Sequence, residues 1–269
     1  MVRLDQVGRK KLRACTALTG RLVVLVGMMM IMGVLLALSW AAHAQVGTIL
    51  EVGAFSMASE GTSLPDGWTP LTFKKIEKQT SYQLVKDGGT TVVKAVSEAS
   101  ASGLTRAITI NLADYPIVQW RWKVANVLKQ GNAMKPEGDD YPARLYMTFE
   151  YDSSKVGLLK KAQYEALKLL YGQYPPLSAI TYIWDSALPT GTVLRSPYTE
   201  RVMMIVVESG MERLNQWVTE ERNVYQDYRT AFGNEPPMIS GIAVMTDTDN
   251  TGEAATAYYG DIVFKKGTL

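Results

Sequence analysis

The chain has 269 residues, with 28 lysines and arginines, 26 aspartates and glutamates, one histidine and one cysteine. Cys15 and His43 both lie within the first 44 residues, so the rest of the chain excludes disulfides, thiolate nucleophiles, serine-histidine triads and zinc sites built on imidazole or thiolate. Six of the basic residues and one of the acidic residues also lie there, which leaves 22 basic against 25 acidic residues and excludes a nucleic-acid partner.

The first 44 residues have the order of a secretory signal. Six basic residues, of which Arg21 is the last, precede an unbroken apolar run over residues 22–40. Ala42 and Ala44 match the small positions that a signal peptidase recognises, so we predict a signal peptide over residues 1–44, cleaved before Gln45. The alternative is an uncleaved anchor, because the run nearly reaches the roughly 20 residues that span a bilayer. In both cases the positive-inside rule predicts a periplasmic or secreted protein, with membrane contact only through this segment.

Residues 45–269 are predicted to form a single, mainly β domain. Short runs that alternate apolar and polar residues between turn formers are typical of half-buried strands. In chain order these runs cover residues 82–86, 91–97, 104–110, 117–124, 144–151, 180–184, 202–208, 216–219, 239–246 and 256–264. Short turns without regular strand-helix alternation favour an antiparallel β-sandwich of jelly-roll type.

Two inserted helices are predicted between these strands. Residues 155–171 place Leu159, Ala166 and Leu170 on one face, which indicates a helix packed on a sheet or, as the alternative, a helix on a membrane surface. The second helix begins at Asn223, an N-cap residue, and ends at Gly233 before two prolines.

Trp120 and Trp122 are two residues apart on one predicted strand, so their side chains share a face with Val118 and Val124. The flanking valines favour a place in the core over a stacking platform for sugar rings. Arg121 then lies on the opposite, polar face.

Two acidic loops are the candidate ligand-binding surface. The first carries Asp139 and Asp140 shortly before Arg144, at the start of a strand. The second brings Asp247, Asp249 and Glu253 within seven residues, a density of oxygen ligands suited to calcium, although its spacing is not that of an EF-hand. The alternative for both loops is a set of turns whose carboxylates only cap backbone groups. No cofactor other than this calcium ion is expected, and no catalytic residue stands out, although carboxylates or tyrosines alone can support polysaccharide chemistry.

Six strings along the chain carry a resemblance to a known family: LPDGWTPLTFKKI, VVKAVSEASASGL, YPIVQWRWKV, EGDDYPARLYMTFEY, YTERVMMIVVESG and ISGIAVMTDTDNTGEAATAYYGDIVF. Their order over residues 53–264 resembles the exported bacterial domain-of-unknown-function family 3047 and, more distantly, jelly-roll carbohydrate-binding modules. The resemblance implies no catalytic residues. We therefore expect an exported, non-catalytic β-sandwich that binds a glycan or another cell-envelope component, with a polysaccharide-acting enzyme and a structural envelope protein as alternatives.

Overall fold

The computed structural model describes residues 48–61, 64–151 and 177–267. The chain divides into two compact units, Met1–Thr48 and Ile49–Leu269, and the second contains every element described below. The predicted signal peptide over residues 1–44 and the predicted helix over residues 155–171 lie outside the described residues. No helix in the described part of the chain is long and apolar enough to cross a membrane.

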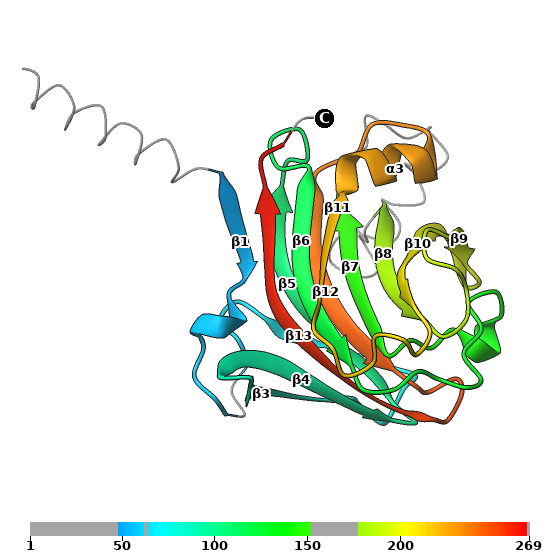
Figure 1. The fold of residues 1–269 in the computed structure, drawn as a ribbon. Helices are drawn as coiled ribbons and strands as arrows, with labels where there is room; N and C mark the ends of the chain where they lie inside the picture. The colour runs from blue at the N-terminus through cyan, green and yellow to red at the C-terminus, as the bar shows by residue number, and fades with distance from the viewer. Residues whose placement is uncertain (1–47, 62–63, 152–176, 268–269) are drawn as a thin grey trace, which may run out of the picture. The chain divides into compact units, whose positions relative to one another are not determined.

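Two sheets form a β-sandwich, which confirms the predicted mainly β fold (Figure 1). The first sheet has six strands in the order β11-β6-β13-β4-β3, with β1 paired to the second half of β13. Its strands are β1 (Ile49–Gly53), β3 (Ser81–Asp87), β4 (Thr90–Glu98), β6 (Ile117–Val124), β11 (Val218–Asn223) and β13 (Ala254–Lys265). The hairpin between β3 and β4 turns at Gly88 and Gly89, which both have positive φ.

The second sheet has seven strands in the order β2-β5-β12-β7-β8-β10-β9. They are β2 (Thr69–Leu71), β5 (Ala101–Ile110), β7 (Ala143–Phe149), β8 (Ser178–Asp185), β9 (Val193–Ser196), β10 (Thr199–Ser209) and β12 (Ile239–Asp247). The expectation of a wholly antiparallel sandwich is wrong at one pair, because β8 and β10 run in parallel. Strand β8 is buried along its whole length, as is typical of a strand covered on both faces. The jelly-roll type of sandwich stays a prediction.

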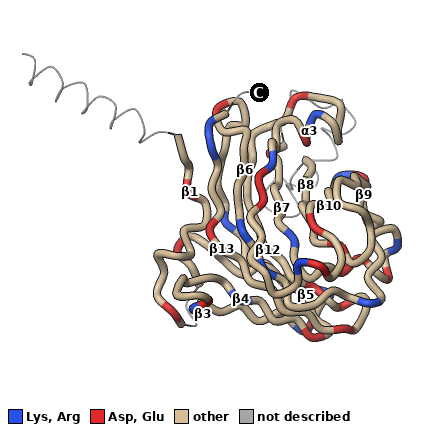
Figure 2. The backbone as a smooth tube through the Cα atoms, viewed as in Figure 1, with Lys and Arg blue, Asp and Glu red and all other residues tan. Residues whose placement is uncertain are grey.

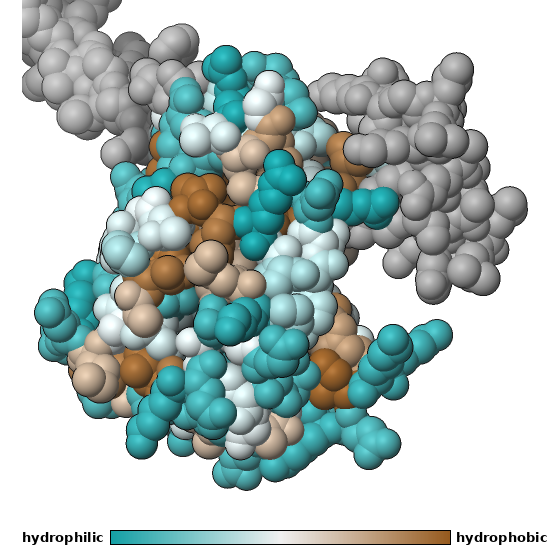
Figure 3. Space-filling view, turned by 90° about the vertical axis from the view of Figure 1, so that its right-hand side faces the viewer, coloured by the Kyte–Doolittle hydropathy of each residue, from teal (hydrophilic) through white to brown (hydrophobic). Residues whose placement is uncertain are grey.

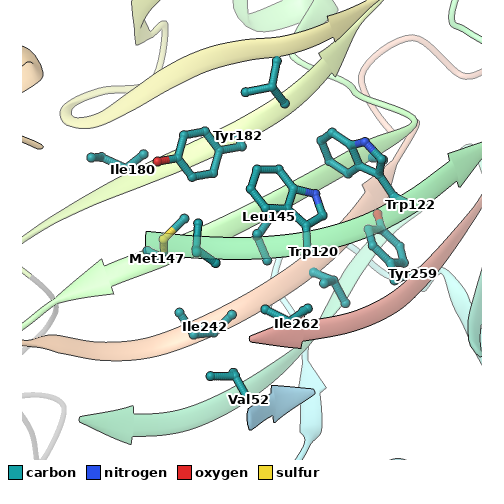
Figure 4. Packing of buried hydrophobic residues seen from close by; sticks show 14 of the residues in the cluster. Val52, Trp120, Trp122, Leu145, Met147, Ile180, Tyr182, Ile242, Tyr259 and Ile262 are labelled. Atoms are coloured by element: carbon teal, nitrogen blue, oxygen red, sulfur yellow. The ribbon is translucent and has the colours of Figure 1, made fainter. Parts of the chain in front are cut away.

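The core between the sheets holds the two tryptophans of β6, as predicted (Figure 4). Trp120 and Trp122 are 2% and 0% exposed, and their rings meet edge to face with centroids 5.4 Å apart. Trp120 also stacks on Tyr182 of the opposite sheet at 5.1 Å, while Trp122 packs near Trp184. These contacts join the two sheets through large aromatic surfaces and leave neither indole available as a sugar platform.

One of the two predicted helices is described, namely α3 (Val224–Phe232). The Asn223 side chain accepts a hydrogen bond from the backbone N–H of Gln226 at 3.0 Å, and Gly233 ends the helix in the left-handed conformation with φ of 74°. Both ends follow the expected capping chemistry. Strands β1, β2 and β9 were not predicted, because short strands at sheet edges show little alternation.

A second, smaller apolar cluster lies on the outer side of β8 and β10. Ile183, Met204 and Val206 of these strands pack against Ala133 and Tyr141 from the segment between β6 and β7. This segment contains the short 3-10 helix η2 (Pro136–Gly138), in which a side chain in place of Gly138 would lie 2.7 Å from atoms of Asn132. The cluster anchors the first acidic loop against the sheet. The side of the molecule near β9 and β10 has apolar patches bordered by hydrophilic residues (Figure 3).

Candidate functional site: a cleft that ends in an acidic cluster

A cleft of about 830 Å³ lies on the outer face of the seven-stranded sheet. It crosses β2, β5, β12 and β7, where the register places Ala107 opposite Gly241 and Thr105 opposite Ala243. These small residues leave the middle of the sheet hollow because they carry little side-chain volume, and Ala101 does the same beside Asp247.

One part of the cleft is lined by hydroxyl groups and by apolar side chains. The hydroxyl groups belong to Thr69, Thr105, Tyr146, Thr148 and Ser240. The Thr148 and Ser240 hydroxyls lie 3.0 Å apart and hydrogen-bond each other across β7 and β12. Apolar lining comes from Leu71, Phe73 and Ile76, in β2 and the segment after it, and from Ile242 and Met245 of β12. Phe73 is 37% exposed, so part of its ring is available to a ligand.

At the other end of the cleft, Arg144 of β7 is the centre of a buried ion-pair network. Its guanidinium makes a two-pronged interaction with the Asp247 carboxylate of β12, in which Nε donates to Oδ1 at 2.8 Å and Nη2 donates to Oδ2. It also donates to the Asp139 backbone carbonyl at 2.6 Å and to the Tyr146 hydroxyl at 3.0 Å. The guanidinium carbon lies 4.3 Å from the centre of the Tyr141 ring. Arg144 is therefore held rigidly by both loops and by β7 itself.

Asp140 joins the two acidic loops. Its carboxylate oxygens accept hydrogen bonds from the backbone N–H groups of Asn250 at 3.3 Å and Thr251 at 2.6 Å. One carboxylate oxygen from each of Asp140, Asp247 and Asp249 lies within 4.8 Å of the others. The structure thus brings five of the six predicted site residues together, namely Asp139, Asp140, Arg144, Asp247 and Asp249. Acidic residues gather in the loops at the lower right of Figure 2.

Glu253, the sixth predicted site residue, has a different place. Its carboxylate accepts hydrogen bonds from the backbone N–H groups of Lys129 at 3.0 Å and Gln130 at 2.8 Å. Among the described residues, the group of neighbouring carboxylates is Asp140, Asp247 and Asp249, and it does not include Glu253. Glu253 therefore caps backbone groups of a turn, which is the alternative that the sequence analysis gave for the carboxylates of both loops.

Burial and like charge act together on the acidic cluster. Burial raises the pKa of Asp139, and Asp140 raises it further, against the opposing effect of Arg144. Burial also raises the pKa of Asp249, again with a contribution from the charge of Asp140. Asp139, Asp247 and Asp249 line this end of the cleft with one guanidinium, and Asp140 lies beside them. The site therefore favours a cationic partner.

Sequence reasoning missed several residues of the cleft. Tyr198, in the turn between β9 and β10, accepts a hydrogen bond from the Asn250 side chain and donates one to the Pro136 carbonyl, each at 2.9 Å. Phe73 comes from the irregular segment after β2. Neither Tyr198 nor Phe73 belongs to a sequence pattern that would identify it as a site residue. Tyr146 and Thr148 were not missed in this way, because strand alternation along the sequence predicts that they lie on the same outward face as Arg144.

A family model described as "Protein of unknown function (DUF3047)" matches residues 66–263. The chain belongs to this family. The DUF3047 match contains every residue named above in the cleft and the acidic cluster, and it confirms the resemblance carried by the sequence motifs. No curated protein matches the chain.

Several solved structures are similar to this DUF3047 chain at low sequence identity. The carbohydrate recognition domain of Emp47p is 9% identical with a TM-score of 0.42, and the match covers 83% of this chain and 99% of that one. A family 30 carbohydrate-binding module of a Clostridium thermocellum cellulosomal cellulase is 9% identical with a TM-score of 0.35, covering 82% and 99%. The cellulose induced protein Cip1 is 10% identical with a TM-score of 0.34, covering 79% and 96%.

Proposed function

We propose that this protein is a non-catalytic glycan-binding β-sandwich whose ligand lies in the cleft on the seven-stranded sheet. The observation that carries the proposal is the make-up of the cleft, in which an apolar wall, rows of hydroxyl groups and a rigid carboxylate-guanidinium pair face one hollow. Sites for small ligands commonly combine apolar surface with a few fixed polar groups.

A sugar ring matches this combination of surfaces. Its C–H faces pack on aromatic and aliphatic side chains, for which Phe73 and Leu71 provide the contact area. Its hydroxyl groups both donate and accept, so they pair with Thr69, Thr148 and Ser240 on the floor. Arg144 and Asp247, which already hold each other in place, need little reorganisation to bind a ligand.

Binding is favoured over catalysis because two of the carboxylates are already engaged. Both oxygens of Asp247 accept from Arg144, and both oxygens of Asp140 accept from backbone N–H groups. A glycosidase needs one carboxyl group that donates a proton and another that attacks the sugar or activates water, with both facing the scissile bond. Held in these hydrogen bonds, Asp140 and Asp247 support the structure of the site.

We also propose that the protein works outside the cytoplasm, in the periplasm or as a secreted protein, on a component of the cell envelope. The support is the order of basic and apolar residues in the first 44 positions, followed by a small-residue cleavage site.

The test is binding of purified protein to an array of neutral and uronic-acid oligosaccharides, followed by calorimetry on the best ligand. We expect the Phe73→Ala variant to weaken the affinity by about tenfold, as loss of a stacked aromatic costs roughly 1 to 2 kcal/mol. Met211→Ala is the control, because Met211 is 70% exposed and lies outside the residues that line the cleft. Equal affinities of wild type and Phe73→Ala would place the ligand elsewhere. Shortened oligosaccharides after incubation would establish an enzyme instead.

A further inference from the structure

We propose that the acidic end of the cleft is a calcium site, in which Asp140, Asp247 and Asp249 supply ligands and the buried carboxylate oxygen of Asp139 completes the set. This inference does not depend on glycan binding, because the ion would be held by the protein alone.

The first observation is the spacing of the carboxylates. Oxygen atoms of Asp140, Asp247 and Asp249 all lie within 4.8 Å of one another. Calcium binds oxygen at about 2.3 to 2.6 Å, so ligands on opposite sides of the ion are roughly 4.6 to 5.2 Å apart. Magnesium binds at about 2.0 to 2.1 Å in a strict octahedron, which requires a tighter set of oxygens. Carboxylate oxygens within this limit can therefore surround one calcium ion.

The second observation is an unsatisfied carboxylate oxygen. Oδ1 of Asp139 is buried and has no hydrogen-bond partner among the described residues, and the Asp139 side chain is only 7% exposed. Arg144 reaches the other oxygen, Oδ2, at 3.7 Å, and otherwise uses the backbone carbonyl of Asp139. A buried carboxylate oxygen without a donor is costly, and a bound cation removes that cost. Asp139 lines the same end of the cleft as Asp247 and Asp249.

The charges point to the same kind of ligand. Asp139 and Asp247 both pair with Arg144, and oxygens of Asp140 and Asp249 lie within 4.8 Å of an Asp247 oxygen. A divalent cation would balance most of the negative charge that Arg144 leaves. Carboxylates are the preferred ligands of hard cations such as calcium.

The existing hydrogen bonds orient the carboxylates and leave lone pairs on their oxygens that can bind an ion. A carboxylate oxygen has two lone pairs, so Asp140 and Asp247 can each bind an ion while accepting from the backbone or from Arg144. The second acidic loop is closed by a hydrogen bond from the Gly252 N–H to the Thr248 carbonyl at 2.9 Å. Such outer contacts hold the ligands of a metal site in place before the ion arrives.

Calorimetry and thermal melting with calcium chloride test the proposal on the whole protein after treatment with EDTA and dialysis. We expect one calcium ion per chain and a higher melting temperature with calcium than without it. Asp249→Asn is the first variant, because Asp249 is partly exposed and the change keeps the shape of the side chain. It should weaken calcium binding by about tenfold or more, since the number of charged ligands sets the affinity. Asp139→Asn should weaken binding as well. Asp66→Asn, an exposed aspartate outside the cleft, is the matched control and should bind calcium as the wild type does.

Three outcomes would overturn the calcium site. They are the absence of calcium binding in the wild type, equal calcium affinity in the wild type and both cleft variants, and tighter binding of magnesium than of calcium. The failure of this proposal is distinguishable from failure of glycan binding, because calcium is titrated alone here, whereas the Phe73→Ala variant tests the glycan without altering any carboxylate.

Discussion

Arg144 and Asp247 lie 103 positions apart in the chain and form a two-pronged ion pair across neighbouring strands of one sheet. Both are almost completely buried, at 4% and 1% exposure. The pair links the start of β7 to the end of β12, so it determines the shape of the acidic end of the cleft.

Breaking this ion pair should destabilise the fold strongly. Asp247→Asn leaves the buried guanidinium without its main counter-charge, and we expect a loss of about 3 to 5 kcal/mol in the free energy of unfolding. Denaturant titration measures the loss. Arg195→Leu is the control, because its pair with Glu200 is largely exposed and should contribute less than about 1 kcal/mol. Equal, small losses in both variants would contradict a structural role for the buried pair.

Truncation of the core tryptophans should reduce stability and spare the ligand site. Trp120→Ala and Trp122→Ala each remove a buried indole that joins the two sheets, and should cost about 3 to 5 kcal/mol. Trp217→Ala, at a position that is only partly buried, should cost less. Thermal melts of the three variants provide the comparison. Loss of glycan affinity at unchanged stability in the Trp120 variant would show that the tryptophan belongs to a binding platform.

Stability should depend on pH through Glu220 of β11. Burial, together with the nearby charge of Glu208, raises the pKa of Glu220 to about 7 from its ordinary value of 4.5. The folded state therefore holds this proton more tightly than the unfolded state does. Its contribution to stability is present below pH 4.5 and is lost as the pH rises to about 7.

Glu220→Gln should make the free energy of unfolding depend less on pH between 4.5 and about 7, because the variant has no proton to lose at this position. Denaturant titrations at several pH values from 4.5 to 8 measure the slope. Glu221→Gln is the control, because Glu221 is exposed and next to Glu220 in the chain. It should keep the wild-type slope of unfolding free energy against pH. Identical slopes in wild type and Glu220→Gln would assign the pH dependence to another group.

Export should remove the first 44 residues. Protein recovered from the periplasm or the medium is expected to begin at Gln45, because Ala42 and Ala44 occupy the positions that a signal peptidase recognises. Intact mass spectrometry distinguishes this form from the full chain. A full-length species in the membrane fraction would support the anchor instead.

Much of the fold could be predicted from local patterns in the sequence. Alternation along residues 117–124 identified a strand and also the face on which Trp120 and Trp122 are buried, because successive side chains of a strand point to opposite sides. The helix after Asn223 was readable for a similar reason, since capping depends on residues within one turn. The absence of His and Cys after residue 44 determined that any metal ligands would be oxygen atoms.

Tertiary structure alone decided which segments meet. Local alternation contains no information on strand direction, so the parallel pairing of β8 with β10 could not be predicted. The register that places Arg144 beside Met245, and its guanidinium on Asp247, depends on how β7 and β12 pair within the whole sheet. The same packing assigned Asp140 and Asp249 to one cluster and Glu253 to the backbone of another loop, although all three come from acid-rich turns. Residue type and spacing act over a few positions, whereas a site built from several loops is created only when burial of the core brings distant segments together.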